Sequence, residues 1–113
     1  MAEISLRIDL GEDRRFGPGK ARLLELIRET GSISAAGRAL GMSYRRAWLL
    51  TDALNQMFGA QLVEPQHGGA KGGGARVTPQ GLATLEAYRR IEAAAEKALE
   101  KEGKAFKAKG KKG

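Results

Sequence analysis

The sequence has 113 residues, the length of one ordinary domain, and its 42% hydrophobic and 29% charged residues are typical of a soluble globular protein; the formal net charge is +7. No apolar run approaches the roughly 20 residues that span a bilayer, and the charged first residues do not resemble a signal peptide, so we expect a cytoplasmic protein without membrane contact. Zero cysteines and one histidine exclude disulfides, thiolate zinc sites and cysteine nucleophiles and supply a metal site poorly, so we expect no metal or other cofactor.

Residues 3–10, with the sequence EISLRIDL, predict a β-strand with one buried face. Apolar and polar side chains alternate along this segment with a period of two, which is the period of a strand. The apolar members are Ile4, Leu6, Ile8 and Leu10.

Two helices are predicted next. After the GPG at 17–19, the run KARLLELIRET places Leu23, Leu26 and Ile27 on one side at helical spacing, and Gly31 ends the helix. Either Ser32 or Ser34 then caps a short helix that ends at Leu40, because a serine oxygen accepts one of the unpaired amides of the first turn.

Gly41 predicts a sharp turn before a third helix, because glycine adopts a positive φ without steric cost. Ser43 is expected to cap this helix, whose core-facing residues follow a three-four spacing: Ala47, Leu50, Leu54 and Met57. The same spacing directs the first-turn side chains Tyr44, Arg45 and Arg46 outward. We expect Trp48, one turn later, to pack in the core or at its rim.

The segments QLVEP and ARVT predict a hairpin with a long tip, since five of the seven positions 68–74 are glycine. Thr78 and Pro79 then begin a helix that runs to about residue 101, with an apolar stripe at Leu82, Leu85, Tyr88, Ile91, Ala95 and Ala98.

This last helix predicts a homodimer. At ~1.5 Å per residue it extends about 36 Å, longer than a compact domain of this size covers with its own core. Pairing with a second copy would bury its far half, and we expect the interface to contain Ile4, Leu6, Ile8, Leu85, Tyr88, Ile91, Ala95, Ala98 and Leu99. The alternative is a solvated, alanine-rich helix that frays.

The C-terminal residues predict a basic disordered tail. Residues 101–113 contain six Lys and one Glu without periodic apolar positions. We therefore assign 1–101 to the folded domain and 102–113 to a tail that either keeps the protein in solution or attracts phosphates without regard to sequence.

The order of helix, short helix, glycine turn, longer helix and hairpin is that of a winged helix-turn-helix, a mainly α fold with a small β component. Its second turn-flanking helix enters the DNA major groove, where Arg45 or Arg46 can donate to guanine O6 and N7. Three serines, Ser32, Ser34 and Ser43, can donate to phosphates, and Tyr44 either contacts DNA or packs on the preceding helix. In the wing, we expect Lys71, Gly72, Gly73 and Arg76 to reach the backbone or the minor groove.

The motifs GSIS, SYRRAW, LVE and the wing GGAKGGGARVT resemble the N-terminal DNA-binding domain of ModE-type, molybdate-responsive transcriptional regulators, over residues 3 to about 100. The resemblance implies a dimer built through the first strand and the long last helix. Those regulators usually carry C-terminal molybdate-binding domains, whereas no oxyanion site is visible here. We expect a naturally short relative rather than a fragment. LysR-type regulators, with a similar GSxxxAA helix-turn-helix, are the second likeness, without this first strand and wing.

Two other classes of function compete with sequence-specific DNA binding. A nucleotide-hydrolysing enzyme is excluded, because a Walker loop needs Gly-Lys-Ser/Thr opening a helix, whereas here the lysine is embedded in glycines before a strand. A protein-interaction module, or a non-specific DNA-binding protein, stays open as the alternative. Against the interaction module, residues 38–76 carry five basic side chains and only two acidic ones, Asp52 and Glu64.

Overall fold

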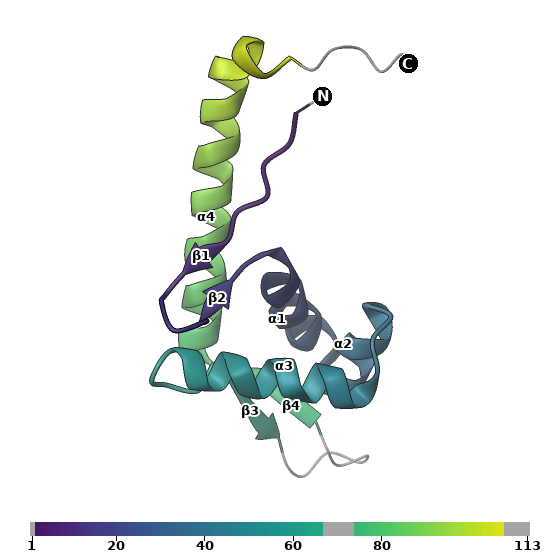
Figure 1. The fold of residues 1–113 in the computed structure, drawn as a ribbon. Coiled ribbons are helices and arrows are strands. Elements are labelled where there is room, and N and C mark those ends of the chain that lie inside the picture. The colour runs from purple at the N-terminus through teal and green to yellow at the C-terminus, as the bar shows by residue number, and fades with distance from the viewer. Residues whose placement is uncertain (1, 67–73, 108–113) are drawn as a thin grey trace.

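The computed structural model describes residues 2–66 and 74–107, whose elements follow the predicted order (Figure 1). They are β1 (Ile8–Asp9), β2 (Arg15–Phe16), α1 (Pro18–Thr30), α2 (Ile33–Ala39), α3 (Tyr44–Met57), β3 (Val63–Gln66), β4 (Gly74–Val77), α4 (Pro79–Glu102) and a 3-10 helix, η1 (Gly103–Phe106). Two antiparallel pairs, β1 with β2 and β3 with β4, complete the described structure. The mainly α winged helix-turn-helix is thereby confirmed.

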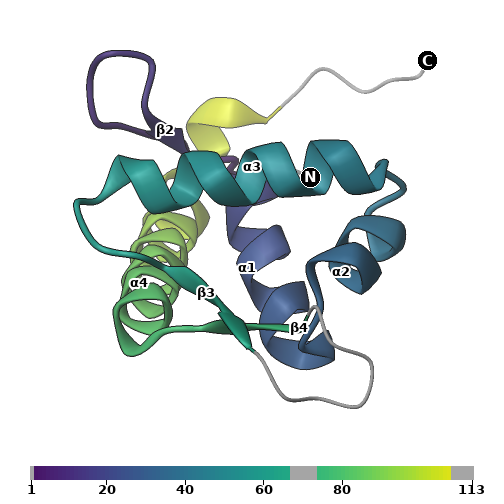
Figure 2. The ribbon, with the colours of Figure 1, turned by 90° about the horizontal axis from the view of Figure 1, so that it is seen from below.

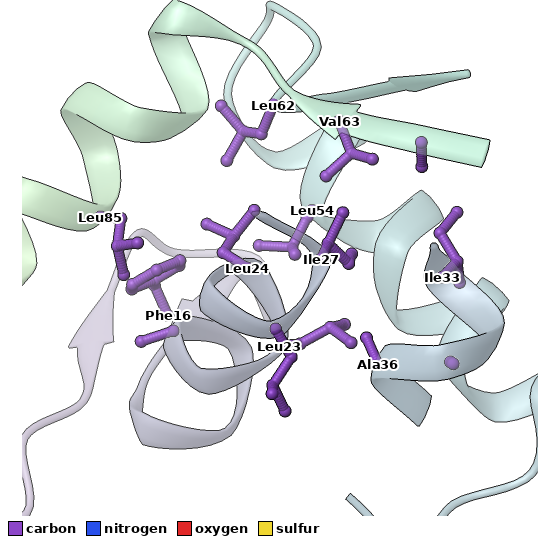
Figure 3. Close-up of a cluster of buried hydrophobic side chains, with 14 of the residues drawn as sticks. Phe16, Leu23, Leu24, Ile27, Ile33, Ala36, Leu54, Leu62, Val63 and Leu85 are labelled. Carbon is purple, nitrogen blue, oxygen red and sulfur yellow. The ribbon is translucent and has the colours of Figure 1, made fainter. Parts of the chain in front are cut away.

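Helix α1 lies at the centre of the core. Its side chains Leu23, Leu24 and Ile27 have no exposed surface, and they pack against Phe16, Leu54 and Leu62 from other elements (Figure 3). Every layer of the domain therefore contacts α1, and burial of these apolar side chains is the main stabilising term for the fold.

The helix-turn-helix is fixed by local caps, as predicted. Gly31 ends α1 with a φ of +70°, and Gly41 has the same φ in the turn before α3. Of the two candidate serines, Ser32 caps α2, with its Oγ accepting from the Ala35 amide at 3.0 Å. The Ser43 Oγ accepts from the Arg46 amide at 3.1 Å and caps α3. Each cap satisfies a helix amide that has no partner within its own helix.

The hairpin is joined to α3 by Asn55, a residue that the sequence patterns did not single out. Its Oδ1 accepts from the Leu62 and Val63 amides, and its Nδ2 donates to the Val63 carbonyl, all at 2.9 Å. This amide side chain therefore sets where the wing begins relative to α3.

The predicted strand at 3–10 is wrong in length. Only Ile8 and Asp9 pair, with Phe16 and Arg15, although the alternation of half-buried and exposed residues continues back to Glu3. The alternation shows that one face of this segment is covered. A segment forms a β-strand only where its backbone also hydrogen-bonds to a neighbouring strand. The partner strand β2 is two residues long because α1 begins at Pro18.

Helix α4 has two unlike halves. Its first half packs on the core through Gly81, Leu85 and Tyr88, whereas no residue from Arg89 to Glu102 is buried. The end of this helix points away from α3 and the wing strands, which lie together at the opposite end of the molecule (Figure 1). None of the described helices is long and apolar enough to cross a bilayer.

Two predictions about the C-terminal region are corrected. Leu85 and Tyr88 are 3% and 1% exposed, so they fill the core of the domain and leave no surface for a partner. The Tyr88 ring lies edge-on to Phe16, with centroids 5.1 Å apart.

In addition, the predicted tail begins too early, because α4 continues to Glu102 and η1 forms a further helical turn. Residues 108–113 lie outside the described residues.

Candidate nucleic-acid interface

The outward side of α3 is the first component of the candidate interface. The helix packs inward through Ala47, Thr51, Leu54 and Met57. Because these positions occupy one side of the cylinder, Tyr44, Arg45 and Arg46 project from the other, and all three are exposed as predicted. Figure 2 shows α3 lying across this end of the molecule, with α2 beside one end and the β3–β4 hairpin along its flank.

The arginines of the helix-turn-helix are not neutralised. Across residues 2–66 and 74–107, no carboxylate forms an ion pair with Arg38, Arg45 or Arg46. Arg38 Nη1 donates to Ser34 Oγ at 3.1 Å, which orients the guanidinium without cancelling its charge. Three positive charges therefore face solvent around the turn between α2 and α3, where they can attract phosphates.

Trp48 lies on the surface and is not among the side chains packed against the core, so the expectation that it packs in the core or at its rim is wrong. Its indole is 45% exposed, and its Nε1 donates to the Tyr44 hydroxyl. The indole N–H is therefore occupied within the protein, while the Tyr44 hydroxyl keeps its own proton for a further acceptor.

Leu49 was missed by the sequence patterns. It is 57% exposed and borders a shallow hollow on α3 together with Tyr44, Arg45, Trp48 and Asp52. The sequence contained a signal for its exposure. Leu49 falls outside the core spacing of Ala47, Leu50 and Leu54, which places it on the outward side of the helix.

The three predicted serines lie at the helix N-termini, but each oxygen already accepts a hydrogen bond. Ser32 and Ser43 accept from backbone amides of α2 and α3, and Ser34 accepts from Arg38. Because a hydroxyl is also a donor, each serine can still donate to a phosphate without breaking these bonds.

Only part of the predicted wing site is described. Arg76 lies opposite Glu64 in the β3–β4 register, and its Nη2 is 3.4 Å from the Glu64 Oε1. Both side chains are exposed, so solvent screens the pair, and Glu64 neutralises the Arg76 charge only in part. Lys71, Gly72 and Gly73 lie outside the described residues.

Some charges elsewhere on the domain are paired. In the groove between α1 and α4, Arg89 bonds to Glu25 and to Glu92, each at 2.7 Å. These two carboxylates raise the pKa of the Arg89 guanidinium. Within the described residues, no group of three or more His, Cys, Asp or Glu is arranged to hold a metal ion.

Comparison with protein families identifies a regulatory helix-turn-helix family. The model of bacterial regulatory helix-turn-helix proteins of the lysR family matches residues 19–82, which span α1 to the first residues of α4. LysR-type regulators are the second of the two families that the sequence motifs resemble.

Several relatives are similar to the chain at the level of sequence. The molybdenum-pterin-binding protein MopB of Rhodobacter capsulatus is 45% identical over 85 residues, which cover 75% of this chain and 32% of MopB. The molybdenum transport protein ModE of Azotobacter vinelandii is 34% identical over 101 residues, covering 89% and 37%. The DNA-binding transcriptional dual regulator ModE of Escherichia coli K12 is 37% identical over 87 residues, covering 77% and 33%. The predicted resemblance to ModE-type regulators is confirmed, and the chain spans about a third of their length.

Solved structures give a similar fold. A crystal structure of a CbnR_DBD–DNA complex has a TM-score of 0.60 and 26% identity, and the match covers 79% of this chain and 97% of that chain. Full-length CbnR complexed with its target DNA has a TM-score of 0.56 and 25% identity, covering 74% of this chain and 27% of that one.

Proposed function

Because the chain belongs to the lysR family of bacterial regulatory helix-turn-helix proteins, we propose that it regulates transcription by binding a specific double-stranded DNA site as a homodimer. The observation that carries the proposal is the exposed arginine pair at the N-terminus of α3, which has no acidic partner among the described residues. The proposal contains no catalytic step.

Helical geometry divides the roles of the two arginines. At ~100° per residue, Arg45 shares the centre of the outward side with Leu49 and Asp52, while Arg46 lies about a quarter-turn away. Arg45 is therefore aimed at base edges, where its two donors match guanine O6 and N7. Arg46 is aimed at the wall of the groove, where it would neutralise a phosphate.

The remaining contacts position the protein on the duplex. Ser32, Ser34, Ser43 and Tyr44 are exposed or half-buried around the same turn and would donate to phosphates and sugars. In the wing, Arg76 shares its charge with Glu64, so Lys71 would be the main positive charge near the DNA. Gly72 and Gly73 would let the chain approach the backbone or minor groove closely.

The dimer surface is formed by the far half of α4 and the N-terminal segment. Ile91 is 47% exposed, Ala98 is exposed, and Ile4, Leu6, Ile8, Ala95 and Leu99 are half-buried in the single protomer. The Tyr88 hydroxyl donates to the Leu6 carbonyl at 2.8 Å and joins the N-terminal segment to α4. Burial raises the pKa of the Tyr88 phenol, so this donor keeps its proton over the ordinary pH range. A second copy would cover both elements at once.

Molybdenum is not part of the proposal. The relatives whose names mention it are more than twice as long as this chain, and those names do not say which region binds the metal.

Selection from a random duplex library tests the proposal. The full chain should enrich an inverted repeat whose half-sites are about one helical turn, 34–36 Å, apart or a multiple of it. A variant with Arg45→Ala and Arg46→Ala should enrich nothing, whereas the charge-matched control Arg28→Ala with Arg90→Ala, on the α1–α4 side, should enrich the same repeat. Binding without enrichment would indicate a non-specific DNA-binding protein. No binding at all would favour the protein-interaction module.

A further inference from the structure

Exposed large apolar side chains are concentrated on α3. Of the five that the described residues contain, three are on this helix: Tyr44, Trp48 and Leu49. An exposed leucine alone needs no explanation, but an apolar cluster between uncompensated arginines at the tip of a helix-turn-helix does.

At Leu49 and Trp48 the cluster presents apolar surface without a free hydrogen-bonding group. Leu49 has no polar atom, and the single donor of Trp48 is already bonded to the Tyr44 hydroxyl. The surface that Leu49 presents at the centre of the outward side therefore needs an apolar partner.

The DNA major groove offers one such partner. Base edges there present hydrogen-bond donors and acceptors, apart from the 5-methyl group of thymine. We propose that Leu49 recognises the 5-methyl group of a thymine in each half-site, and so acts as a specificity-determining residue beside Arg45. This inference rests on the proposed function, because it assigns a base to a position on the DNA-facing helix.

The helix also fixes where that thymine lies. Leu49 follows Arg45 by four residues, about 6 Å along the axis at ~1.5 Å per residue. Base pairs are stacked at ~3.4 Å. The thymine therefore lies within about two base pairs of the guanine that Arg45 contacts.

The charges around Leu49 favour DNA over a protein partner as the occupant. Arg45 precedes it, and Arg38 and Arg46 flank the turn with no ion pair to any described carboxylate. Asp52 closes the far end of the same side and is hydrogen-bonded by Gln56 at 3.3 Å. A carboxylate there is repelled by phosphates, so a DNA-bound α3 would keep this end of the helix away from the backbone.

Replacement of thymine by deoxyuridine tests the inference, because it removes the methyl group and leaves base pairing unchanged. Each thymine of the selected repeat is replaced in turn in one half-site, and the Kd is measured for the 113-residue chain. We expect one position, within about two base pairs of the Arg45 guanine, at which the substitution weakens binding about fourfold, the worth of one buried methyl group. In Leu49→Ala the same substitution should have no effect.

Arg46→Ala is the matched control, since it should weaken binding to every duplex while keeping the fourfold dependence on the methyl group. An enriched repeat without any deoxyuridine-sensitive position would overturn the inference and leave the proposed function standing. A sensitivity that persists in Leu49→Ala would assign the methyl contact to another residue and the Leu49 surface to another occupant. If no repeat is enriched, the proposed function fails first.

Discussion

Two surfaces of this molecule expose large apolar side chains, and they differ in charge. The outward side of α3 exposes Tyr44, Trp48 and Leu49 beside two arginines. The far half of α4 exposes Ile91, and its residues 91–102 contain four Glu and two Lys. Both surfaces leave apolar area in water, which is costly, so both predict a partner.

The difference in charge distinguishes the partners. An excess of glutamate along α4 repels a phosphate backbone, whereas a second copy can align these glutamates with its own lysines. The exposed arginines of α3, which have no acidic partners among the described residues, attract a phosphate backbone instead. Apolar exposure therefore predicts that a surface is covered, and the flanking charges predict by what.

The largest effect is expected at the α4 surface. Ile91→Asp would place a charge in the apolar stripe, so the proposed dimer should dissociate to a monomer in sedimentation measurements. Affinity for the inverted repeat should fall about a hundredfold or more, because each copy then binds one half-site without the avidity of two. Glu96→Gln, on the same half of α4, should remain a dimer. If Ile91→Asp sediments like the parent protein, the far half of α4 is not the interface.

A second change compares the two sides of α3. Asn55→Ala removes three hydrogen bonds and leaves the Leu62 and Val63 amides without this partner, so the free energy of unfolding should fall by about 2–4 kcal/mol. Leu49→Ala, on the exposed side of the same helix, should lower it by less than about 0.5 kcal/mol. Denaturant titration measures both values, and equal losses would contradict the division of α3 into a structural and a binding side.

The smallest effect separates base recognition from backbone contact. Arg45→Ala should weaken binding to the selected repeat by about 1–3 kcal/mol and leave binding to random duplex nearly unchanged. Lys71→Ala should weaken both alike and reduce the slope of log K against log salt by about 1. Titrations at several salt concentrations distinguish the two patterns. Equal losses for both variants on both duplexes would reject the assigned roles.

Sequence reasoning succeeded where structure is decided by local chemistry. The helix end at Gly31, the turn at Gly41, and the caps at Ser43 and Thr78 were predicted because each depends on the backbone of its own few residues. It failed where a residue's partner is distant in sequence. The Asn55 bonds to β3, the Arg76–Glu64 pair and the burial of Tyr88 against Phe16 all depend on how the elements pack.

Periodicity and composition by themselves determined the order of the helices, the position of the helix-turn-helix and the exposure of Tyr44, Arg45 and Arg46, because caps and apolar spacing are properties of short segments. Only the tertiary structure decided which apolar residues are core and which are surface. Leu85 and Ile91 belong to one stripe of α4, yet the first is covered by α1 and its neighbours while the second extends past them. The apolar stripe identifies which side of α4 is apolar. The extent of the domain core packed against α4 determines how much of that side is buried.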